Sequence, residues 1–316
     1  MVVLAPMADV TDNPFRRILS EIGAPDVYWN EFVSADGLSH PVARPKLERM
    51  LSYTPEQRPI IAQIFSGDAG HLKQAAALCR EKGFDGIDIN MGCPARNIIK
   101  QVSGSELSKP EHRERVSDII TQTREGAGEK PVSVKTRLGF NEVDFDWVEH
   151  VLSHQLPCFT LHLRTKKEMS KVPAHWELLD KIIRIRDRVS PDTILIANGD
   201  VENRMQAYEK VQKHPGLDGV MIGRGVLQNP WAFAEDCLVR HSVQERLELA
   251  MRHTRYFIEE YEIDGRLEKN FNLMKKFYKL YINGFDGAKE LRVELMTAKD
   301  YQDVETICNN FSNRVQ

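Results

Sequence analysis

Cys93 is the residue of this sequence best placed to do chemistry. It lies in a Gly-Cys-Pro turn directly after an apolar stretch, within the segment DINMGCP (88–94). Glycine permits an unusual backbone in such a turn, and proline fixes the direction in which the chain leaves it. Free cysteines are usually buried and inert, but loops that follow strands are where reactive side chains concentrate. We therefore expect this turn to present the Cys93 thiol to a site.

The other four cysteines do not share this setting, since they lie in helical or strand-interior patterns. We expect them to be small buried side chains: Cys79, Cys158, Cys237 and Cys308. The odd number, the wide spacing and the lack of a Cys-x₂-Cys pair argue against a disulfide framework and against a zinc site.

A lysine and a histidine occur at the ends of two further strand-like stretches. In PVSVKTRL (131–138), Lys135 shares one face with Ser133 and Arg137, while two valines share the other. A lysine that points into a core needs a counter-charge. Lys135 therefore reaches solvent at the strand end, contacts an anion such as a flavin, or serves as a Schiff-base amine. His162 ends CFTLHL and is either structural or part of a site.

Two amide side chains complete the polar set. Gln63 and Asn90 each end an apolar stretch, and each offers a hydrogen-bond donor and an acceptor in one group. Such amides suit a planar heterocycle with alternating carbonyl and N–H groups, for example a flavin or a uracil ring. Either residue could equally be a satisfied amide of the core.

Glycine-rich turns follow the last two strand-like stretches. They read Asn198-Gly199-Asp200 and Gly223-Arg224-Gly225. Glycine lets backbone N–H groups approach an anion, and Arg224 adds charge. In a (β/α)₈ barrel the loops after strands seven and eight are the recurrent phosphate site. These turns therefore predict a phosphorylated cofactor or substrate.

All these residues fall at the carboxyl ends of strands in one repeating pattern. Eight β-rich runs alternate with stretches of helical periodicity such as 71–83, 114–127 and 176–189. The expected strands are 2–6, 27–33, 59–65, 86–90, 131–138, 158–163, 193–198 and 218–223. This order predicts an α/β fold, a (β/α)₈ TIM barrel over residues 1–235. Its active site would lie at the face where Pro6, Met7 and the polar residues above meet.

Beyond the barrel the β pattern stops. Helices are predicted at 242–261, 266–283, 286–297 and 300–312, with breaks at Asp264-Gly265 and Gly284. Residues 236–316 are therefore expected to form a small C-terminal helical domain.

Composition narrows the class of protein. The chain has 316 residues, of which 41% are hydrophobic and 28% are charged, and its formal net charge is −3. This charge argues against coating nucleic acid by bulk electrostatics, but a local basic patch could still bind RNA. No run approaches the length of a membrane span, and no basic stretch precedes the apolar residues of MVVLAPMADV. We expect a cytoplasmic protein, monomeric by default, with no obligatory protein partner.

The motifs together resemble the tRNA-dihydrouridine synthases, FMN enzymes that reduce uridine with NADPH. The resemblance runs from about Leu4 to Phe233 and more loosely beyond. It rests on LAPMADVTDNPFR (4–16), NEFVSADGL (30–38), AQIFSGD (62–68), DINMGCP (88–94), SVKTRLGF (133–140), HLRTKKE (162–168), ANGD (197–200) and VMIGRG (220–225).

The resemblance implies a role for each matching residue. FMN would be bound by Pro6, Met7, Gln63, Lys135, His162, Asn198, Gly199, Asp200, Gly223 and Arg224. Cys93 would be the general acid, and its chemistry requires the protonated thiol. Substrate would be bound by Asn90, which would orient the uracil, and by Arg164, Lys275 and Lys276.

Three places depart from the family pattern. Asn97 stands where a basic residue is often found, Glu106 and Ser108 interrupt a run of small residues and leucine, and His175 replaces an acidic residue before Trp176. The first two bear on the Cys93 loop, and none touches the flavin set.

The helical domain would contribute to tRNA binding. Segment 266–279 mixes basic residues with Phe271, Phe277 and Tyr278, a composition that suits backbone contact with base stacking. It equally fits a solvated amphipathic helix with aromatic residues in the core, and the resemblance favours RNA.

Three other functions share parts of this pattern. A different FMN barrel enzyme acting on a small dihydropyrimidine or enone would not need the helical domain. A Schiff-base aldolase would use Lys135 without a flavin. An RNA-binding protein or tRNA chaperone would not need Cys93.

Overall fold

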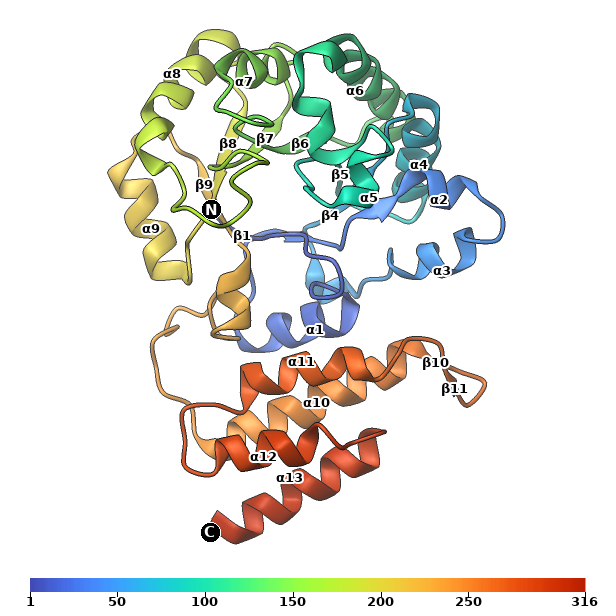
Figure 1. The fold of residues 1–316 in the computed structure, drawn as a ribbon, viewed down its shortest axis with the longest axis vertical. Coiled ribbons are helices and arrows are strands. Elements are labelled where there is room, and N and C mark those ends of the chain that lie inside the picture. The colour runs from blue at the N-terminus through green and yellow to red at the C-terminus, as the bar shows by residue number, and fades with distance from the viewer. Residues whose placement is uncertain (316) are drawn as a thin grey trace.

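Nine parallel strands form one sheet that curls into a barrel in the computed structural model, which describes residues 1–315 (Figure 1). They are β1 Val2–Leu4, β2 Tyr28–Trp29, β3 Val33–Ser34, β4 Ile60–Phe65, β5 Gly86–Met91, β6 Val132–Arg137, β7 Cys158–His162, β8 Ile194–Asn198 and β9 Gly219–Ile222. The order is β1-β9-β8-β7-β6-β5-β4-β2, and β3 also pairs with β4. A bridge from Val3 to Val27 closes the ring. The predicted (β/α)₈ barrel is confirmed.

Helices cover the outside of the barrel between successive strands (Figure 1). They are α1 Asn13–Ile22, α2 Ala35–Ser39, α3 Arg44–Arg49, α4 Ala69–Glu81, α5 Arg96–Ile99, α6 Arg113–Ala127, α7 Phe145–Leu152, α8 Leu179–Val189 and α9 Arg204–Lys213. Side chains define several starts: Asp12, Asp68 and Asp144 each accept a backbone N–H in the first turn of α1, α4 and α7. The predicted helices at 71–83, 114–127 and 176–189 are confirmed, with a short 3₁₀ turn at Trp176–Leu178 before α8.

The prediction of one continuous second strand, 27–33, is wrong, because the strand is interrupted in its middle. The structure divides it into β2 and β3. The reason is Asn30, whose side-chain Oδ1 accepts the backbone N–H of Gln63 at 2.7 Å, in place of a carbonyl of the strand ladder. A side chain that substitutes for a backbone partner interrupts the strand but keeps its neighbour satisfied.

The strand register determines which residues meet at the mouth of the barrel. On β6 the side chains alternate as predicted, because Val132 and Val134 belong to the core beneath the helices while Lys135 and Arg137 face the interior cavity. Asn90 on β5 lies level with Lys135. One layer higher, Arg137, His162 and Asn198 lie level across β6, β7 and β8.

The C-terminal part consists of α10 Val243–Tyr261, a hairpin of β10 Glu262–Ile263 and β11 Arg266–Leu267, α11 Asn272–Tyr281, α12 Ala288–Leu295 and α13 Tyr301–Val315. Figure 1 shows these helices grouped on the α1 side of the barrel. The helix predicted over 266–283 is wrong at its start, because Asp264 and Gly265 adopt positive φ and form a tight hairpin turn. The domain boundary at residue 235 stays a prediction.

No helix within residues 1–315 combines the length and the apolar character that crossing a bilayer requires.

A buried ion pair joins the C-terminal part to the loop after β1. Lys269 Nζ donates to Asp12 Oδ2 at 3.1 Å, and Asp12 is 4% exposed. Glu31 lies buried in the same cluster, where burial and the nearby Asp12 raise its pKa to about 7. Lys276 on α11 donates to the backbone carbonyl of Asp9 in this loop. The helical part therefore contacts the segment that carries Met7.

We predict that Lys269→Met lowers the free energy of unfolding by about 2–3 kcal/mol, because it leaves the buried Asp12 carboxylate without its ion-pair partner. Urea denaturation at neutral pH measures the loss. Lys275→Met is the matched control, since Lys275 makes no ion pair within the described residues. Equal losses in the two variants would contradict the assigned pair.

Candidate active site

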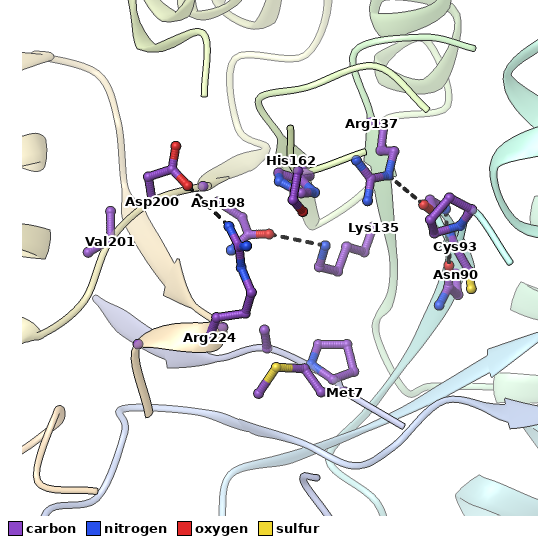
Figure 2. Close-up of a pocket in the computed structure, with 18 of the residues that line it drawn as sticks. Met7, Asn90, Cys93, Lys135, Arg137, His162, Asn198, Asp200, Val201 and Arg224 are labelled. Carbon is purple, nitrogen blue, oxygen red and sulfur yellow. Dashed lines mark hydrogen bonds and ion pairs between the residues drawn. The ribbon is translucent and has the colours of Figure 1, made fainter. Parts of the chain in front are cut away.

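A cavity of about 510 Å³ opens at the carboxyl ends of the barrel strands (Figure 2). It brings together twelve of the predicted site residues: Pro6, Met7, Gln63, Asn90, Cys93, Lys135, His162, Asn198, Gly199, Asp200, Gly223 and Arg224. Three predicted residues, Arg164, Lys275 and Lys276, do not line it. Its size is that of a typical small-molecule or cofactor site.

Lys135 is a half-buried cation that faces this cavity. Its Nζ donates to Asn198 Oδ1 at 3.5 Å, and the Asn198 amide is held by its own bond to the Met221 carbonyl at 2.7 Å. Among residues 1–315 no carboxylate lies within ion-pair distance of Lys135. Burial, and next the nearby Arg137, lower the pKa of Lys135 to about 8. The site thus offers a positive charge to an electron-rich ligand.

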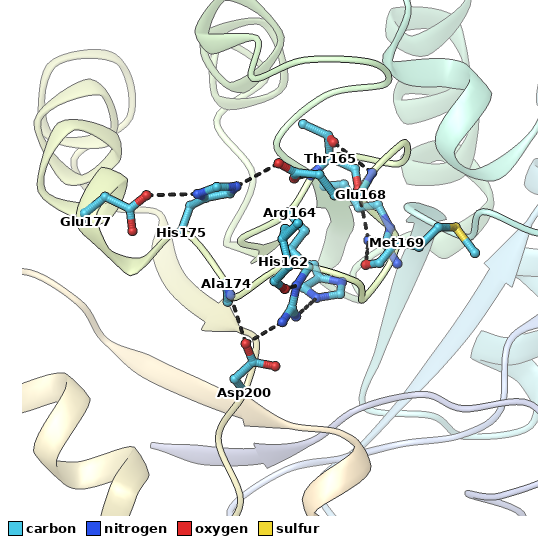
Figure 3. A network of polar contacts seen from close by, with 11 residues as sticks. His162, Arg164, Thr165, Glu168, Met169, Ala174, His175, Glu177 and Asp200 are labelled. Atoms are coloured by element: carbon cyan, nitrogen blue, oxygen red, sulfur yellow. Dashed lines mark hydrogen bonds and ion pairs between the residues drawn. The ribbon is translucent and has the colours of Figure 1, made fainter.

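His162 is held as a neutral ring beside Lys135. Burial, and next Arg137 and Lys135, place the pKa of His162 well below its usual value. Arg164 Nη1 donates to His162 Nε2 at 3.1 Å (Figure 3). Because an arginine can only donate, Nε2 accepts and the proton of the neutral ring resides on Nδ1. His162 can therefore donate one hydrogen bond to a ligand.

Arg164 was predicted to bind substrate, and the structure gives it a different place. Its side chain is 2% exposed and lies behind His162. It donates to the Val172 carbonyl at 2.6 Å and pairs with Asp200 (Figure 3). Arg164 therefore orients the histidine and the loop after β8, with no surface left for a substrate.

The loop after β7 is organised by a histidine between two carboxylates. His175 Nε2 lies 2.8 Å from Glu168 Oε1, and its Nδ1 lies 2.9 Å from Glu177 Oε1 (Figure 3). Glu168 also accepts the backbone N–H of Thr165 at 2.7 Å. The hydrogen bond to Glu168, above all, raises the pKa of His175. The unusual His175 thus bridges two carboxylates through its two ring nitrogens and restrains this loop.

The glycine turns after β8 and β9 form the other end of the cavity. Asp200 pairs with Arg224 at 3.3 Å and accepts the Ala174 N–H at 2.8 Å. A side chain on Gly225 would meet the Glu202 backbone at 2.4 Å, so the turn packs closely there. A side chain on Gly223 would meet only side-chain atoms at 3.6 Å or more. Backbone and guanidinium donors thus border an open cradle suited to an anion.

The Cys93 turn is fixed from both sides. Arg137 Nε donates to the Gly92 carbonyl at 2.8 Å, and the Ser105 N–H donates to the Cys93 carbonyl at 3.0 Å. Gly104 has φ of 59°, and a side chain there would lie 2.7 Å from the same carbonyl. Burial raises the pKa of Cys93, so the thiol form predominates at neutral pH.

Arg137 is a site residue that our prediction did not include, although its signal was present. It lies two residues after Lys135 and therefore on the same strand face. Its Nη1 also donates to the Met169 carbonyl at 3.0 Å, so it links the Cys93 turn to the loop after β7.

The unusual residues near Cys93 do not face its thiol. Asn97 is exposed on the short helix α5. Glu106 pairs with Lys109 at 2.6 Å, and Ser108 donates to the Ser105 carbonyl at 2.8 Å. Glu106 and Ser108 stabilise the turn that places Gly104 against Cys93.

The aromatic residues expected to stack on RNA are part of the core instead. Phe277 is 2% exposed, Tyr278 is 1% exposed and Phe271 is 8% exposed. The Phe277 ring packs 5.3 Å from that of Phe15 on α1. Base stacking on these side chains is therefore excluded, because the amphipathic pattern of 266–279 reflects packing against the barrel.

The closed barrel with a polar cavity at its carboxyl face defines this chain as a (β/α)₈-barrel enzyme. Solved structures of similar fold include 2-naphthoyl-CoA reductase with 2-naphthoyl-CoA, at TM-score 0.58, 10% identity, and coverage of 75% of this chain and 50% of that one. A variant of morphinone reductase with tetrahydroNAD has TM-score 0.52, 11% identity, and coverage of 75% and 86%.

Sequence relationships specify the family. The dihydrouridine synthase model matches residues 3–316. The chain is 39% identical to a probable tRNA-dihydrouridine synthase of Staphylococcus aureus, over 98% of this chain and 92% of that one. It is also 39% identical to probable tRNA-dihydrouridine synthase 2 of Bacillus subtilis, over 99% and 94%. The chain belongs to the dihydrouridine synthase family and is an oxidoreductase.

We predict that His175→Gln reduces stability most at low pH. A histidine whose pKa is raised on folding stabilises the protein below its unfolded pKa, and this contribution is lost as pH rises through the folded value. The difference in free energy of unfolding between wild type and variant should be larger at pH 6 than at alkaline pH by about 0.5–1 kcal/mol. Urea denaturation across this range measures it.

His154→Gln provides the control of opposite sign. Burial, and next the nearby His150, lower the pKa of His154. The contribution of His154 should therefore increase with pH. The same pH trend in both variants would exclude the Glu168–His175 bridge as the cause.

Proposed function

We propose that this protein is a tRNA-dihydrouridine synthase that uses FMN and NADPH to reduce the C5–C6 double bond of specific uridines in tRNA. The observation that carries the proposal is one cavity lined both by the Cys93 thiol, kept protonated by burial, and by the half-buried cation Lys135, which pairs with no carboxylate among residues 1–315. A substrate that needs one proton accounts for the thiol, and an electron-rich cofactor accounts for the cation.

The residues present fit a flavin. Lys135 offers a positive charge to the electron-rich edge of an isoalloxazine ring, and the neutral His162 offers one N–H. Pro6 and Met7 provide an apolar wall on the β1 side of the cavity (Figure 2). The open cradle at Gly223, with Arg224 beside it, suits the phosphate of FMN.

Cys93 supplies the proton that the reduction of a double bond requires in addition to a hydride. Bound in this cavity, reduced FMN would supply the hydride for one carbon of the uracil, and NADPH would supply the electrons that reduce the flavin again. The other carbon then takes a proton from the Cys93 thiol, and solvent returns a proton to the thiolate. A thiol kept protonated by partial burial is in the correct form for this transfer.

The proposed substrate also requires contacts outside the cavity. Lys167 and Lys171 are exposed on the loop after β7, and Lys100 is exposed on the loop that follows Cys93. These lysines can meet tRNA phosphates beside the flipped uridine. Lys275 and Lys276 stay proposed contacts at the helical part, although Lys276 already bonds to the Asp9 carbonyl. A tRNA substrate implies a cytoplasmic location.

We predict that Cys93→Ala lowers the rate of dihydrouridine formation by about 10²–10⁴-fold, because the substrate carbon loses its proton donor. Mass spectrometry of tRNA nucleosides measures the product, and flavin content and tRNA affinity should not change. Cys158→Ala is the matched control, since Cys158 begins β7 at the opposite end of the barrel. Undiminished turnover by the Cys93 variant would refute the acid role.

The purified protein should be yellow and should release FMN on denaturation. Lys135→Met should weaken flavin binding at least about tenfold, because it removes the positive charge beside the ring. Absorbance titration with FMN measures the affinity, and bleaching by NADPH tests the reductant. A colourless protein in which Lys135 forms a borohydride-trappable adduct with a carbonyl compound would support a Schiff-base enzyme instead.

A further inference from the structure

A chain of side-chain hydrogen bonds runs beneath the cavity from a buried carboxylate. Asp88 on β5 is 0% exposed and does not line the cavity. Its Oδ1 accepts from Ser133 Oγ at 2.5 Å, and its Oδ2 accepts from Gln63 Nε2 at 2.6 Å. Gln63 Oε1 in turn accepts from Asn90 Nδ2 at 3.0 Å. We call Asp88, Gln63 and Asn90 the amide relay.

The amide relay ends on the turn that holds the thiol. Asn90 Oδ1 accepts two backbone N–H groups, those of Gly92 and Cys93, each at 3.0 Å. These two bonds fix the start of the turn that Arg137 and Ser105 fix from outside. The position of Cys93 therefore depends on which end of the Asn90 amide faces the turn.

The direction of every bond in the relay is set at its two ends, by Asp88, which accepts, and by the backbone N–H groups of Gly92 and Cys93, which can only donate. A side-chain amide can be rotated to exchange its donor and acceptor ends, but an ionised carboxylate can only accept. The carboxylate thus requires Gln63 to present its NH₂, so the Gln63 oxygen must face Asn90. Asn90 then presents its own NH₂ to Gln63 and its oxygen to the turn.

The charge state of Asp88 suits this role. Burial raises its pKa to about 6, and the bonds from Gln63 and Ser133 oppose that rise. At about pH 8 the group is therefore an anionic acceptor.

We propose that Asp88 is a positioning residue that orients the two amides of the relay and thereby holds Cys93 where it delivers its proton. This inference rests on the proposed function of Cys93. It goes beyond that function because it assigns the alignment of the thiol to a carboxylate outside the cavity.

Asp88→Asn tests the proposal with almost no change in shape. An amide at position 88 accepts either orientation of Gln63, so the Asn90 oxygen is then held toward the turn only by the N–H groups of Gly92 and Cys93. We expect the turn to loosen and the thiol to become more exposed, which lowers its pKa. At about pH 8 the rate of Cys93 alkylation by iodoacetamide, followed by peptide mass spectrometry, should rise about 3- to 10-fold. The kcat should fall at least about tenfold while the KM for tRNA stays within about twofold.

Ser133→Ala is the matched control. It removes the other hydrogen bond to Asp88 but leaves the carboxylate to orient Gln63, so alkylation and kcat should stay near wild-type values. Asp88→Asn combined with Gln63→Glu provides a rescue. The carboxylate then sits at position 63, accepts from both neighbours and again directs the Asn90 oxygen toward the turn. The alkylation rate should return toward the wild-type value.

Gln63→Met interrupts the relay without changing Asp88 and covers the case in which Asp88→Asn does not fold. It should accelerate Cys93 alkylation as Asp88→Asn does. A wild-type alkylation rate in folded Gln63→Met or Asp88→Asn protein, or no recovery in the double variant, overturns the proposal. Alkylation needs no tRNA or NADPH, so these outcomes are independent of turnover. Failure of the proposed function would instead appear as absence of dihydrouridine formation by the wild-type enzyme.

Discussion

The burial of positive charge at the mouth of the barrel is the constraint on which the site depends. Lys135 and Arg137 occupy alternate positions of β6, and both face inward from a strand whose other face packs beneath helices. Desolvation makes each cation costly, so the surrounding groups are arranged to accept hydrogen bonds. Arg137 is satisfied by backbone carbonyls of two loops, and Lys135 by one amide oxygen. Lys135 is the less satisfied of the two and is the one that can bind a ligand.

Burial and the same cations determine the protonation of their neighbours. Burial, and next Arg137, Lys135 and Arg164, lower the pKa of His162, so the ring stays neutral and donates a hydrogen bond through one nitrogen only. The pKa of Cys93 is subject to opposing influences, because burial favours the thiol while the Ala95 N–H, and next Arg137 and Lys135, favour the thiolate, and burial is the larger. If the thiol were fully exposed beside these cations, its pKa would fall. More of it would then be thiolate at neutral pH, and the thiolate has no proton to donate. Partial burial therefore preserves the proton that the proposed reaction needs.

Sequence patterns were sufficient for the barrel and for most of the cavity, because strand ends in a parallel barrel necessarily meet at one face. They were not sufficient where side chains replace backbone partners. Asn30 interrupts the second strand through a contact with Gln63, which is distant in sequence. An arginine at position 164 could bind substrate or hold His162, and the sequence is the same in both cases. Only the burial of its side chain distinguishes the two roles. Likewise, the sequence pattern around Phe277 and Tyr278 is the same for aromatic residues packed in a core and for aromatic residues that stack on bases.

The helical part and the cavity are connected through the loop after β1. Met7 lines the cavity, and its carbonyl accepts the N–H of Thr11 at 3.0 Å, which closes a tight turn around Asp9. Glu31 accepts the Asp9 N–H, and Lys276 donates to the Asp9 carbonyl, so both backbone polar groups of Asp9 are held from outside the turn. Lys276 belongs to α11, whereas Glu31 belongs to the barrel. A shift of α11 relative to the barrel must therefore be absorbed at Asp9, two residues from the side chain that borders the cofactor cavity.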